Sequence, residues 1–207
     1  MFNIRFLPAR YGDAIRIAYG KPDAPRLVLI DGGTGGTREE ILADLKAYEA
    51  KGGVLELIIV THIDRDHIEG ILKLLEDKDF TLPVGDFWFN GWPQLPQDTD
   101  DEEFGPVQGE RLSTQIRGRG LNWNKHFGGQ AAVIPDTGAL KEITLEGGLK
   151  ITLLNPTLGY LEGLKKVWVK ELRLANLDPG FPEGGHFVAG LTKENRQRNL
   201  VVGEWGP

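Results

Sequence analysis

The sequence contains no cysteine among its 207 residues, and this absence excludes several kinds of site at once. Without thiols the chain has no disulfide framework, and no zinc or iron–sulfur site can use cysteine ligands. Long apolar runs are also missing, because the longest, 27–30 and 57–60, are strand-sized and a membrane-spanning helix needs about 20 residues. Any metal must therefore be held by His, Asp and Glu, and we expect no membrane-embedded segment.

An excess of basic charge is lacking as well. The chain has 24 Lys and Arg against 30 Asp and Glu, a formal net charge of −6, so a nucleic-acid partner is possible but disfavoured. A local basic stretch could touch phosphates, although a solvated face explains it more simply: Arg111, Arg117, Arg119 and Lys125. The start of the chain shows no apolar segment followed by a small-residue cleavage site, so we expect a soluble, cytoplasmic protein.

The first 90 residues alternate strand and helix signals. A composition of 40 % hydrophobic and 26 % charged residues is that of a globular chain. A capping-box spacing from Thr37 to Glu40 starts one helix, which Gly52 stops, and Ile68, Ile71, Leu72 and Leu75 give a second helix to about residue 77. Strands are predicted over 3–7, 14–18, 26–30, 56–60 and 84–89. The order β-β-β-α-β-α-β predicts an α/β domain with a mixed sheet.

The signals weaken after residue 90. We expect a surface insertion over 91–125 that contains a solvated acidic run, 98–103. Helices are predicted over 107–116 and 159–174 and a strand over 150–154, all within one domain spanning 1–207.

Metal-ligating side chains gather in one segment, Thr61-His62-Ile63-Asp64-Arg65-Asp66-His67, between an apolar strand and an amphipathic helix. Alternate side chains of an extended loop point the same way, so His62, Asp64 and Asp66 converge and His67 opens the helix beside them. Such groups can hold one or two divalent ions. Without a cation, packing the two carboxylates together in a partly buried site costs several kcal/mol.

A plainer alternative exists for one of these residues. Asp66 and Glu69 have the spacing of a capping box, so Asp66 could serve only as a helix N-cap. That interpretation leaves His62, Asp64 and His67 unexplained, and we therefore favour the metal site.

The strand, the Thr-His-x-Asp-x-Asp-His motif and the following helix resemble the metallo-β-lactamase superfamily, whose usual signature is His-x-His-x-Asp-His. Asp64 stands where the second His normally lies, and this variant looks like the branch related to the hydrolase domain of the competence protein ComEC. Three further segments match that branch, the last of them as in uncharacterised bacterial hydrolases: Tyr11–Ile15, Leu29–Gly33 and Trp123–Gly129. The resemblance implies an αββα sandwich with mixed sheets.

The resemblance also implies roles for these residues. His62 and Asp64 would bind a first metal, and Asp66 and His67 a second, with Asp66 also orienting the attacking hydroxide as the catalytic residue. Asp31, at a strand end on the same side of the sheet, would hold the ligands in place without binding the metal. An Asp that simply begins a glycine turn is an equal alternative. The cofactor would be one or two zinc ions, with manganese as a further possibility.

The family's later ligands, another His, a bridging Asp and a final His, have no convincing match. His186 stands in the wrong context, and His126, in a helix or loop near the insertion, is a disfavoured candidate. We therefore expect an incomplete sandwich, a first half plus an insertion, whose missing ligands are absent, lost or supplied by a partner chain or second copy. The favoured function is a metal-dependent hydrolase of a phosphodiester or related ester. A non-catalytic binding or assembly module of the same fold is the alternative, and a β-lactam-hydrolysing enzyme is a weaker one because Asp64 replaces His.

Overall fold

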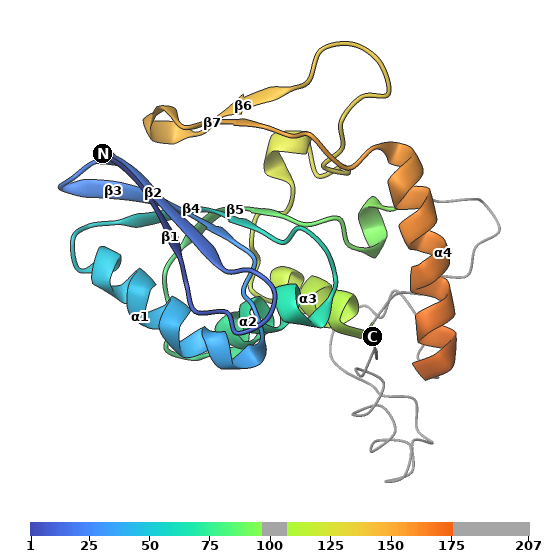
Figure 1. Ribbon diagram of the computed structural model, residues 1–207, viewed down its shortest axis with the longest axis horizontal. Coiled ribbons are helices and arrows are strands. Elements are labelled where there is room, and N and C mark those ends of the chain that lie inside the picture. Colours follow the sequence, from blue (N-terminus) through green and yellow to red (C-terminus); the bar gives the residue numbers. More distant parts are fainter. Residues whose placement is uncertain (97–106, 176–207) are drawn as a thin grey trace, which may run out of the picture.

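A five-stranded mixed sheet forms the centre of the molecule, whose computed structural model describes residues 1–96 and 107–175 (Figure 1). Its strands lie side by side in chain order: β1 (Phe2–Phe6), β2 (Ile15–Lys21), β3 (Ala24–Ile30), β4 (Val54–Ile59) and β5 (Val84–Trp88). The first three strands pair antiparallel, and β3, β4 and β5 pair parallel. Parallel pairs need crossover connections, which helices supply here. The predicted strand–helix order and mixed sheet are confirmed.

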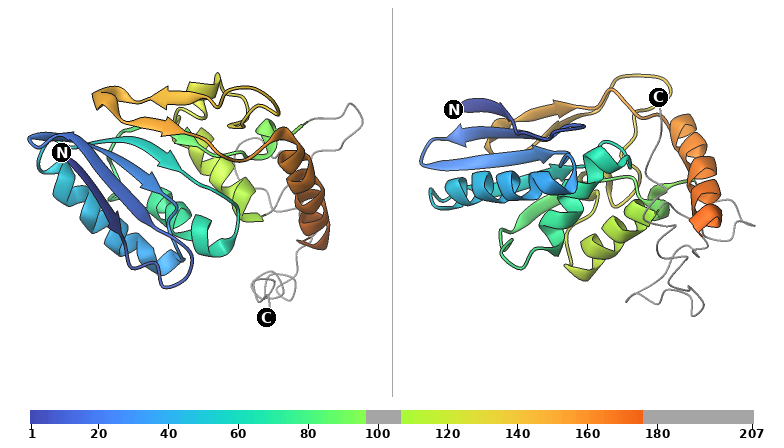
Figure 2. Two further views of the ribbon diagram at one scale, coloured as in Figure 1. Left: turned by 45° about the horizontal axis from the view of Figure 1, so that its top comes forward. Right: turned by 60° about the horizontal axis from the view of Figure 1, so that its bottom comes forward.

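Helices cover one face of this sheet (Figure 2). They are α1 (Arg38–Glu49), entered through the 3₁₀ turn η1 (Gly35–Thr37), α2 (Arg65–Glu76) and α3 (Val107–Gly118). The apolar face of α2 has the predicted i, i+3, i+4, i+7 spacing, and Ile68, Ile71, Leu72 and Leu75 are all buried in the main core. This burial fixes the rotation of α2 about its axis, and with it the direction of the polar residues in its first turn.

The start of α1 differs from the capping-box prediction. Thr37 occupies the N-cap position but makes no side-chain capping bond. Its hydroxyl donates instead to the carbonyl of Ala9 at 3.2 Å, so the residue ties the helix start to the β1–β2 loop. The predicted reciprocal bonds were wrong because a tertiary acceptor competes for the hydroxyl.

A two-stranded antiparallel sheet lies over the opposite face of the main sheet (Figures 1 and 2). It consists of β6 (Glu142–Thr144) and β7 (Lys150–Thr152), joined through the 3₁₀ turn η4 (Glu146–Gly148). A second apolar core fills the space between the sheets: Tyr19, Val28, Leu57 and Trp88 from below, and Ile143 and Leu145 from above. The helices, the main sheet and the second sheet are three layers in the order expected for an incomplete αββα sandwich, with two strands in the second sheet within the described ranges.

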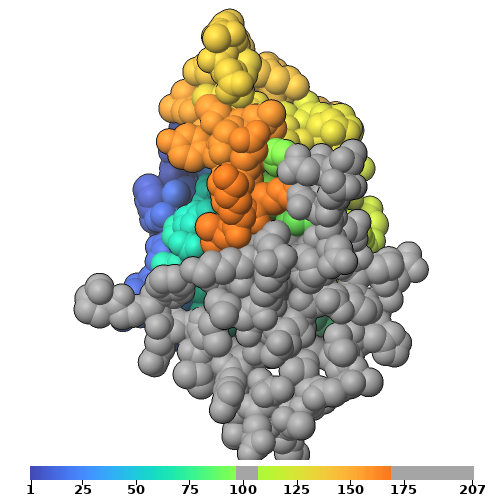
Figure 3. Space-filling view, turned by 90° about the vertical axis from the view of Figure 1, so that its right-hand side faces the viewer, coloured from blue at the N-terminus to red at the C-terminus, as the bar shows by residue number. Residues whose placement is uncertain are grey.

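Two helices of the second half close one side of the molecule. In the space-filling view of Figure 3, α4 (Leu158–Ala175, orange) runs down this flank. Trp168 of α4 packs against α3 at Gly109, where an added Cβ would lie 2.6 Å from the indole ring. α3 itself buries Leu112 and Ile116 in the main core, packing that a surface insertion over 91–125 does not account for.

Other predictions fall on parts of the chain outside the description. The acidic run 98–103 and His186 lie outside the described residues. No helix of the described ranges has the length and apolar character needed to cross a bilayer.

Candidate metal centre

The candidate centre lies at the carboxyl ends of the parallel strands, where β3 and β4 finish side by side. Asp31 directly follows β3, and its backbone N–H donates to the carbonyl of Ile59 at 2.9 Å. Thr61 and His62 follow β4 and lead into α2. The sheet edge therefore brings together residues that are about 30 positions apart in the chain.

Asp31 is a buried carboxylate, 2 % exposed, with a left-handed backbone at φ +56°. Asp is one of the few residues that tolerates this conformation, which turns its side chain back under the β4–α2 loop. Its Oδ1 accepts from the backbone N–H of Thr61 at 2.8 Å, and its Oδ2 accepts from the Thr61 hydroxyl at 2.6 Å. The same Oδ2 lies 3.0 Å from Nδ1 of His67. Asp31 is thus a support for other side chains, and a simple turn former would make none of these contacts.

These contacts fix the tautomers of both histidines. A carboxylate accepts only, so Nδ1 of His67 carries the proton that it shares with Asp31. The hydroxyl proton of Thr61 is already given to Asp31, so Thr61 Oγ1 accepts from Nδ1 of His62 at 2.8 Å. In both rings the lone pair is then on Nε2, the state in which imidazole binds a metal.

The two imidazole rings lie against each other, with centroids 3.7 Å apart and planes inclined by 45°. One donor atom from each of Asp31, His62 and His67 falls within 4.8 Å of the others, and this is the one such group of His, Asp and Glu found in residues 1–96 and 107–175. The His67 side chain is 13 % exposed and that of His62 is 43 % exposed. His67 is therefore the shielded histidine of the pair, and His62 is the one open to solvent.

The two other predicted ligands stand outside that tight group but beside its histidines. Oδ2 of Asp64 is 3.7 Å from Nε2 of His62, and Oδ2 of Asp66 is 3.9 Å from Nε2 of His67. Both separations are too long for hydrogen bonds. Two ligand atoms each about 2.1 Å from one tetrahedral ion lie about 3.4 Å apart, so the pairs are close to the separation that a shared cation requires.

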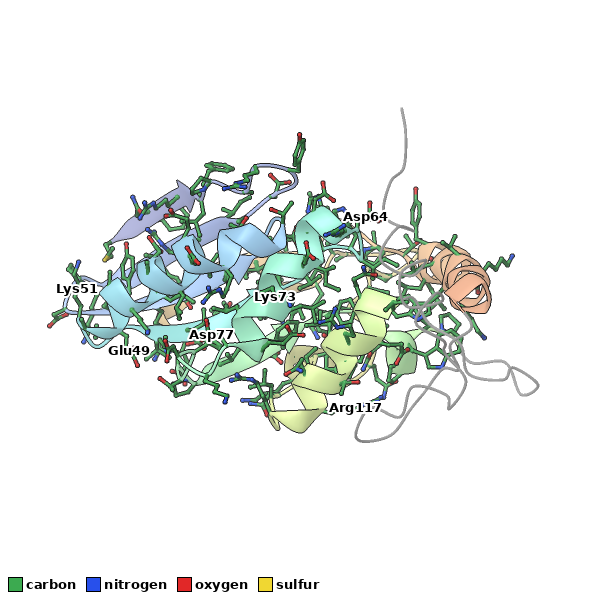
Figure 4. The ribbon with its side chains drawn as sticks, turned by 90° about the horizontal axis from the view of Figure 1, so that it is seen from below. Glu49, Lys51, Asp64, Lys73, Asp77 and Arg117 are labelled. Atoms are coloured by element: carbon green, nitrogen blue, oxygen red, sulfur yellow. The ribbon has the colours of Figure 1, made fainter. Side chains whose placement is uncertain are left out.

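The alternative that Asp66 serves only as the N-cap of the helix is wrong. α2 begins at Arg65, so Asp64, labelled in Figure 4, takes the N-cap position. Asp66 lies within the first turn. Asp64 makes no side-chain capping bond and is 72 % exposed. Neither carboxylate is thus used by the helix as a cap.

Glycines let two segments approach the first turns of α2 closely. Gly12 has φ +67°, and an added Cβ would lie 1.9 Å from the carbonyl oxygen of Asp66. On the other side, the N–H of Gly32 donates to the carbonyl of His67 at 2.8 Å, and a Cβ on Gly70 would lie 1.8 Å from the carbonyl oxygen of Gly32. Only glycine permits these approaches, which hold the ligand-bearing turn by its backbone.

A pocket of about 390 Å³ opens beside His62, between the main sheet and the second-half segments. Its floor comes from the end of β4 and the loop after it, and from the end of β5. Its walls come from the chain leaving β7 and from the first turns of α4. Besides His62, the lining includes Trp88, Ile151, Leu153, Tyr160 and Leu164.

The chain matches the family described as the metallo-beta-lactamase superfamily over residues 25–164, about two thirds of its length. The chain belongs to the metallo-β-lactamase superfamily. No curated protein and no solved structure gives a significant match. The matched range includes Asp31, the whole His62–His67 segment and every pocket-lining residue up to Leu164.

The other candidate histidine does not reach the centre of this metallo-β-lactamase fold. Nδ1 of His126 lies 2.6 Å from Oδ2 of Asp86, a fully buried carboxylate on β5. Asp86 also accepts from the backbone of Lys125 and His126 and from the indole of Trp88. This network fastens the loop at 125–127 to the sheet.

The basic stretch proposed to touch phosphates already has internal partners. Arg111 pairs with Glu76 of α2, and Arg119 donates to the carbonyls of Asp77 and Phe80. Arg117 lies over the ring of Trp123, 5.6 Å from its centroid. Arg111 and Arg119 thus bind α3 and the residue just after it to the end of α2 and the loop that follows α2.

Sequence reasoning missed two contacts, one that supports His62 and one that supports the loop at 125–127. Thr61 stood inside the motif, but its role in passing the Asp31 hydrogen bond to His62 depends on the β3–β4 pairing. The one signal for Asp86 was its place as a charged residue in the middle of an apolar strand. Such a residue indicates a buried polar network.

Proposed function

We propose that the chain is a metal-dependent hydrolase in which His62, Asp64, Asp66 and His67 hold one or two zinc ions. This would be the His-x-Asp-x-Asp-His variant of the superfamily and its ComEC-related branch. The observation that supports the proposal best is the pair of Nε2 lone pairs that Asp31 and Thr61 fix beside two exposed carboxylates. Nitrogen and oxygen donors suit zinc, and the two carboxylates would also accept manganese.

The bound metal would act as a Lewis acid and lower the pKa of water. The protein's own contribution begins with Asp31, which holds His67 from behind and adds to its basicity as a ligand. Asp66, whose side chain is 42 % exposed, offers a free carboxylate oxygen that can accept a proton from the attacking water and orient it. His62 lies at the boundary of the centre and the pocket, so a substrate held in the pocket would present its reacting bond there.

The proposed substrate is a small-molecule phosphodiester or a related ester, and a nucleic acid remains disfavoured by the net charge of −6. A cytoplasmic location is also proposed. Ligands beyond those of the first half would come from a partner chain or a second copy.

A non-catalytic binding or assembly module is the second candidate. It is favoured by one observation: within residues 1–96 and 107–175, no His, Asp or Glu after residue 67 joins the metal-ligating group. Such a module would keep the fold and a metal without turnover.

Metal analysis of the purified chain tests the proposal. We expect one or two equivalents of zinc or manganese in the wild-type chain and none in the His62→Ala/Asp66→Ala double variant. His126→Ala is the matched control, because it removes an imidazole that is also bonded to an aspartate but lies outside the group.

Activity assays then separate the two candidates. Turnover of bis(p-nitrophenyl) phosphate or a carboxylic ester that is lost in the double variant supports the hydrolase, while preferential turnover of nitrocefin would point to β-lactams. A wild-type chain that holds no metal, or that holds metal but hydrolyses no ester, would overturn the proposed hydrolase. The non-catalytic binding module would then be the remaining candidate.

A further inference from the structure

The outer side of β1 is an open sheet edge. β1 is the first strand of the main sheet, dark blue in Figure 2, and within residues 1–96 and 107–175 no strand pairs with its outer side. The opposite edge of the sheet, at β5, is covered: Phe87 donates its N–H to the carbonyl of Asn122 and accepts from the N–H of Asn124. Unpaired N–H and C=O groups along an open edge are a template for a further strand.

Alternate residues of β1 direct their backbone groups to that open edge. The N–H of Leu7, just after β1, donates to the carbonyl of Ala14, just before β2, at 2.8 Å. In an antiparallel pair successive residues bond to opposite sides, so the backbone of Asn3 and Arg5 also faces β2. The residues whose N–H and C=O groups point outward are then the other three, which we call the edge stripe: Phe2, Ile4 and Phe6.

The side chains of the edge stripe are apolar and uncovered, with exposed fractions of 63 %, 48 % and 73 % along the strand. They lie on the face of the main sheet that carries the second sheet, because Arg5, between them, reaches the other face and pairs with Asp44 of α1. The second sheet stops short of them. Tyr19 on β2 is buried in the second core, whereas Phe2, opposite it on β1, is exposed.

We propose that two copies of this chain associate by pairing β1 with β1, antiparallel, about a two-fold axis at Ile4. In that register Ile4 lies opposite Ile4 of the second copy, and Phe2 lies opposite Phe6. The three outward N–H groups of each copy then meet the three outward C=O groups of the other, and the two main sheets become one. This inference is independent of the proposed hydrolase function.

The pattern of β1 is complementary to itself, and this favours a second copy as the partner. On one face aromatic side chains meet aromatic ones and isoleucine meets isoleucine, which are contacts that stabilise antiparallel pairs. On the other face Arg5 lies opposite Asn3, so no like charges are directly opposed, and Arg5 is already paired with Asp44. Edges that resist association commonly carry Lys, Pro or a bulge, and β1 has none of these.

Sedimentation velocity of the full chain tests the association. Each copy contributes one strand of five residues, a small interface, so we expect a dimer that dissociates on dilution. Between about 5 and 500 µM chain, the mass should rise from 22.9 kDa toward twice that value.

The absence of cysteine makes the register testable. Ile4→Cys introduces one thiol per chain, and the two Cα atoms at position 4 would be about 5.5 Å apart, a separation that a disulfide spans. Phe2→Cys is the matched control on the same strand and face, but its two thiols would be about 13 Å apart along the pair. With diamide as oxidant, Ile4→Cys should form the linked dimer about tenfold faster or more. Random collision would instead favour Phe2→Cys, because Phe2 is the more exposed residue.

A pair of lysine variants tests the edge stripe itself. Ile4→Lys sets two ammonium groups opposite each other at the axis and should weaken association by about tenfold or more. Leu154→Lys adds the same charge at another exposed leucine, beyond β7, and should leave the mass distribution unchanged. An equal mixture of Ile4→Lys and Ile4→Glu should restore the dimer, because opposite charges then meet at the axis. Urea denaturation checks that each variant folds.

The outcomes are distinct. A mass that doubles with concentration, faster linking through position 4 and loss of the dimer in Ile4→Lys support the inference. A wild-type chain that stays monomeric at about 500 µM overturns it in favour of a cover for β1 within a single chain. A dimer that survives in Ile4→Lys, or that links equally well through Phe2→Cys, overturns it because its interface lies elsewhere or has another register.

Discussion

Replacing Asp31 by Asn tests whether one buried carboxylate controls the metal centre. The carboxylate offers two acceptor oxygens to three donors: the N–H and hydroxyl of Thr61 and Nδ1 of His67. An amide of the same shape offers one oxygen, so in either orientation its NH₂ group faces at least one of those donors. The negative charge behind His67, which strengthens it as a metal ligand, is also lost.

The expected cost follows from these contacts. Removing a carboxylate that orients a metal-bound histidine lowers metal affinity by about 10–100-fold, which corresponds to roughly 1.4–2.8 kcal/mol. The assay is zinc binding by competition with a chelator at constant pH, with urea denaturation to confirm folding.

Asp86→Asn is the matched control for that measurement. It changes another buried aspartate that is also bonded to a histidine, and none of its hydrogen bonds reaches His62 or His67. We expect its zinc affinity to stay within about threefold of wild type. Wild-type zinc affinity in a folded Asp31→Asn variant, or an equal loss in Asp86→Asn, would refute the role of Asp31.

Two further predictions concern contacts at the two ends of α2. Gly12→Ala should lower the free energy of unfolding by about 2 kcal/mol or more, because φ is positive and the new Cβ meets the carbonyl of Asp66; Gly20→Ala, with positive φ but open space, should cost about 1 kcal/mol in the same urea titration. Equal losses of unfolding free energy in the two variants would show that the close approach of Gly12 to Asp66 does not add to the cost of the substitution. At Glu76, partial burial raises the pKa, but hydrogen bonds and charge from Lys73 and Arg111 lower it by more, so the net shift is downward. The resulting stability, about 0.5 kcal/mol for such partly exposed pairs, is present above the unfolded pKa near 4.5 and is lost as pH falls through the folded value. Glu76→Gln should therefore narrow the gap in unfolding free energy between pH 7 and pH 3, and an unchanged gap would contradict the assignment.

Much of the first half was predictable because its elements are long or strongly periodic. The burial of α2 along Ile68, Ile71 and Leu75 follows directly from helical spacing. β6 was missed because a three-residue strand with Ile143 as its one apolar residue has no period to detect. The role of Thr61 was missed because its acceptor, Asp31, is distant in sequence and the β3–β4 register alone brings the two together.

The candidate site also has a part that could be predicted from the sequence and a part that could not. The clustering of His62 with His67 was predictable from a short stretch of chain. The contribution of Leu153 to the pocket was not, because it depends on how the β6–β7 hairpin lies over the main sheet.

The sharing of one oxygen has a consequence for how the centre would fill. Oδ2 of Asp31 accepts both the Thr61 hydroxyl, which supports His62, and Nδ1 of His67. An ion held by His67 would make its Nδ1–H a stronger donor to that oxygen, and the oxygen would then be a weaker acceptor for Thr61. We therefore expect negative cooperativity, with a first ion bound tightly and a second bound with lower affinity, so that zinc supply would set how many ions the centre carries.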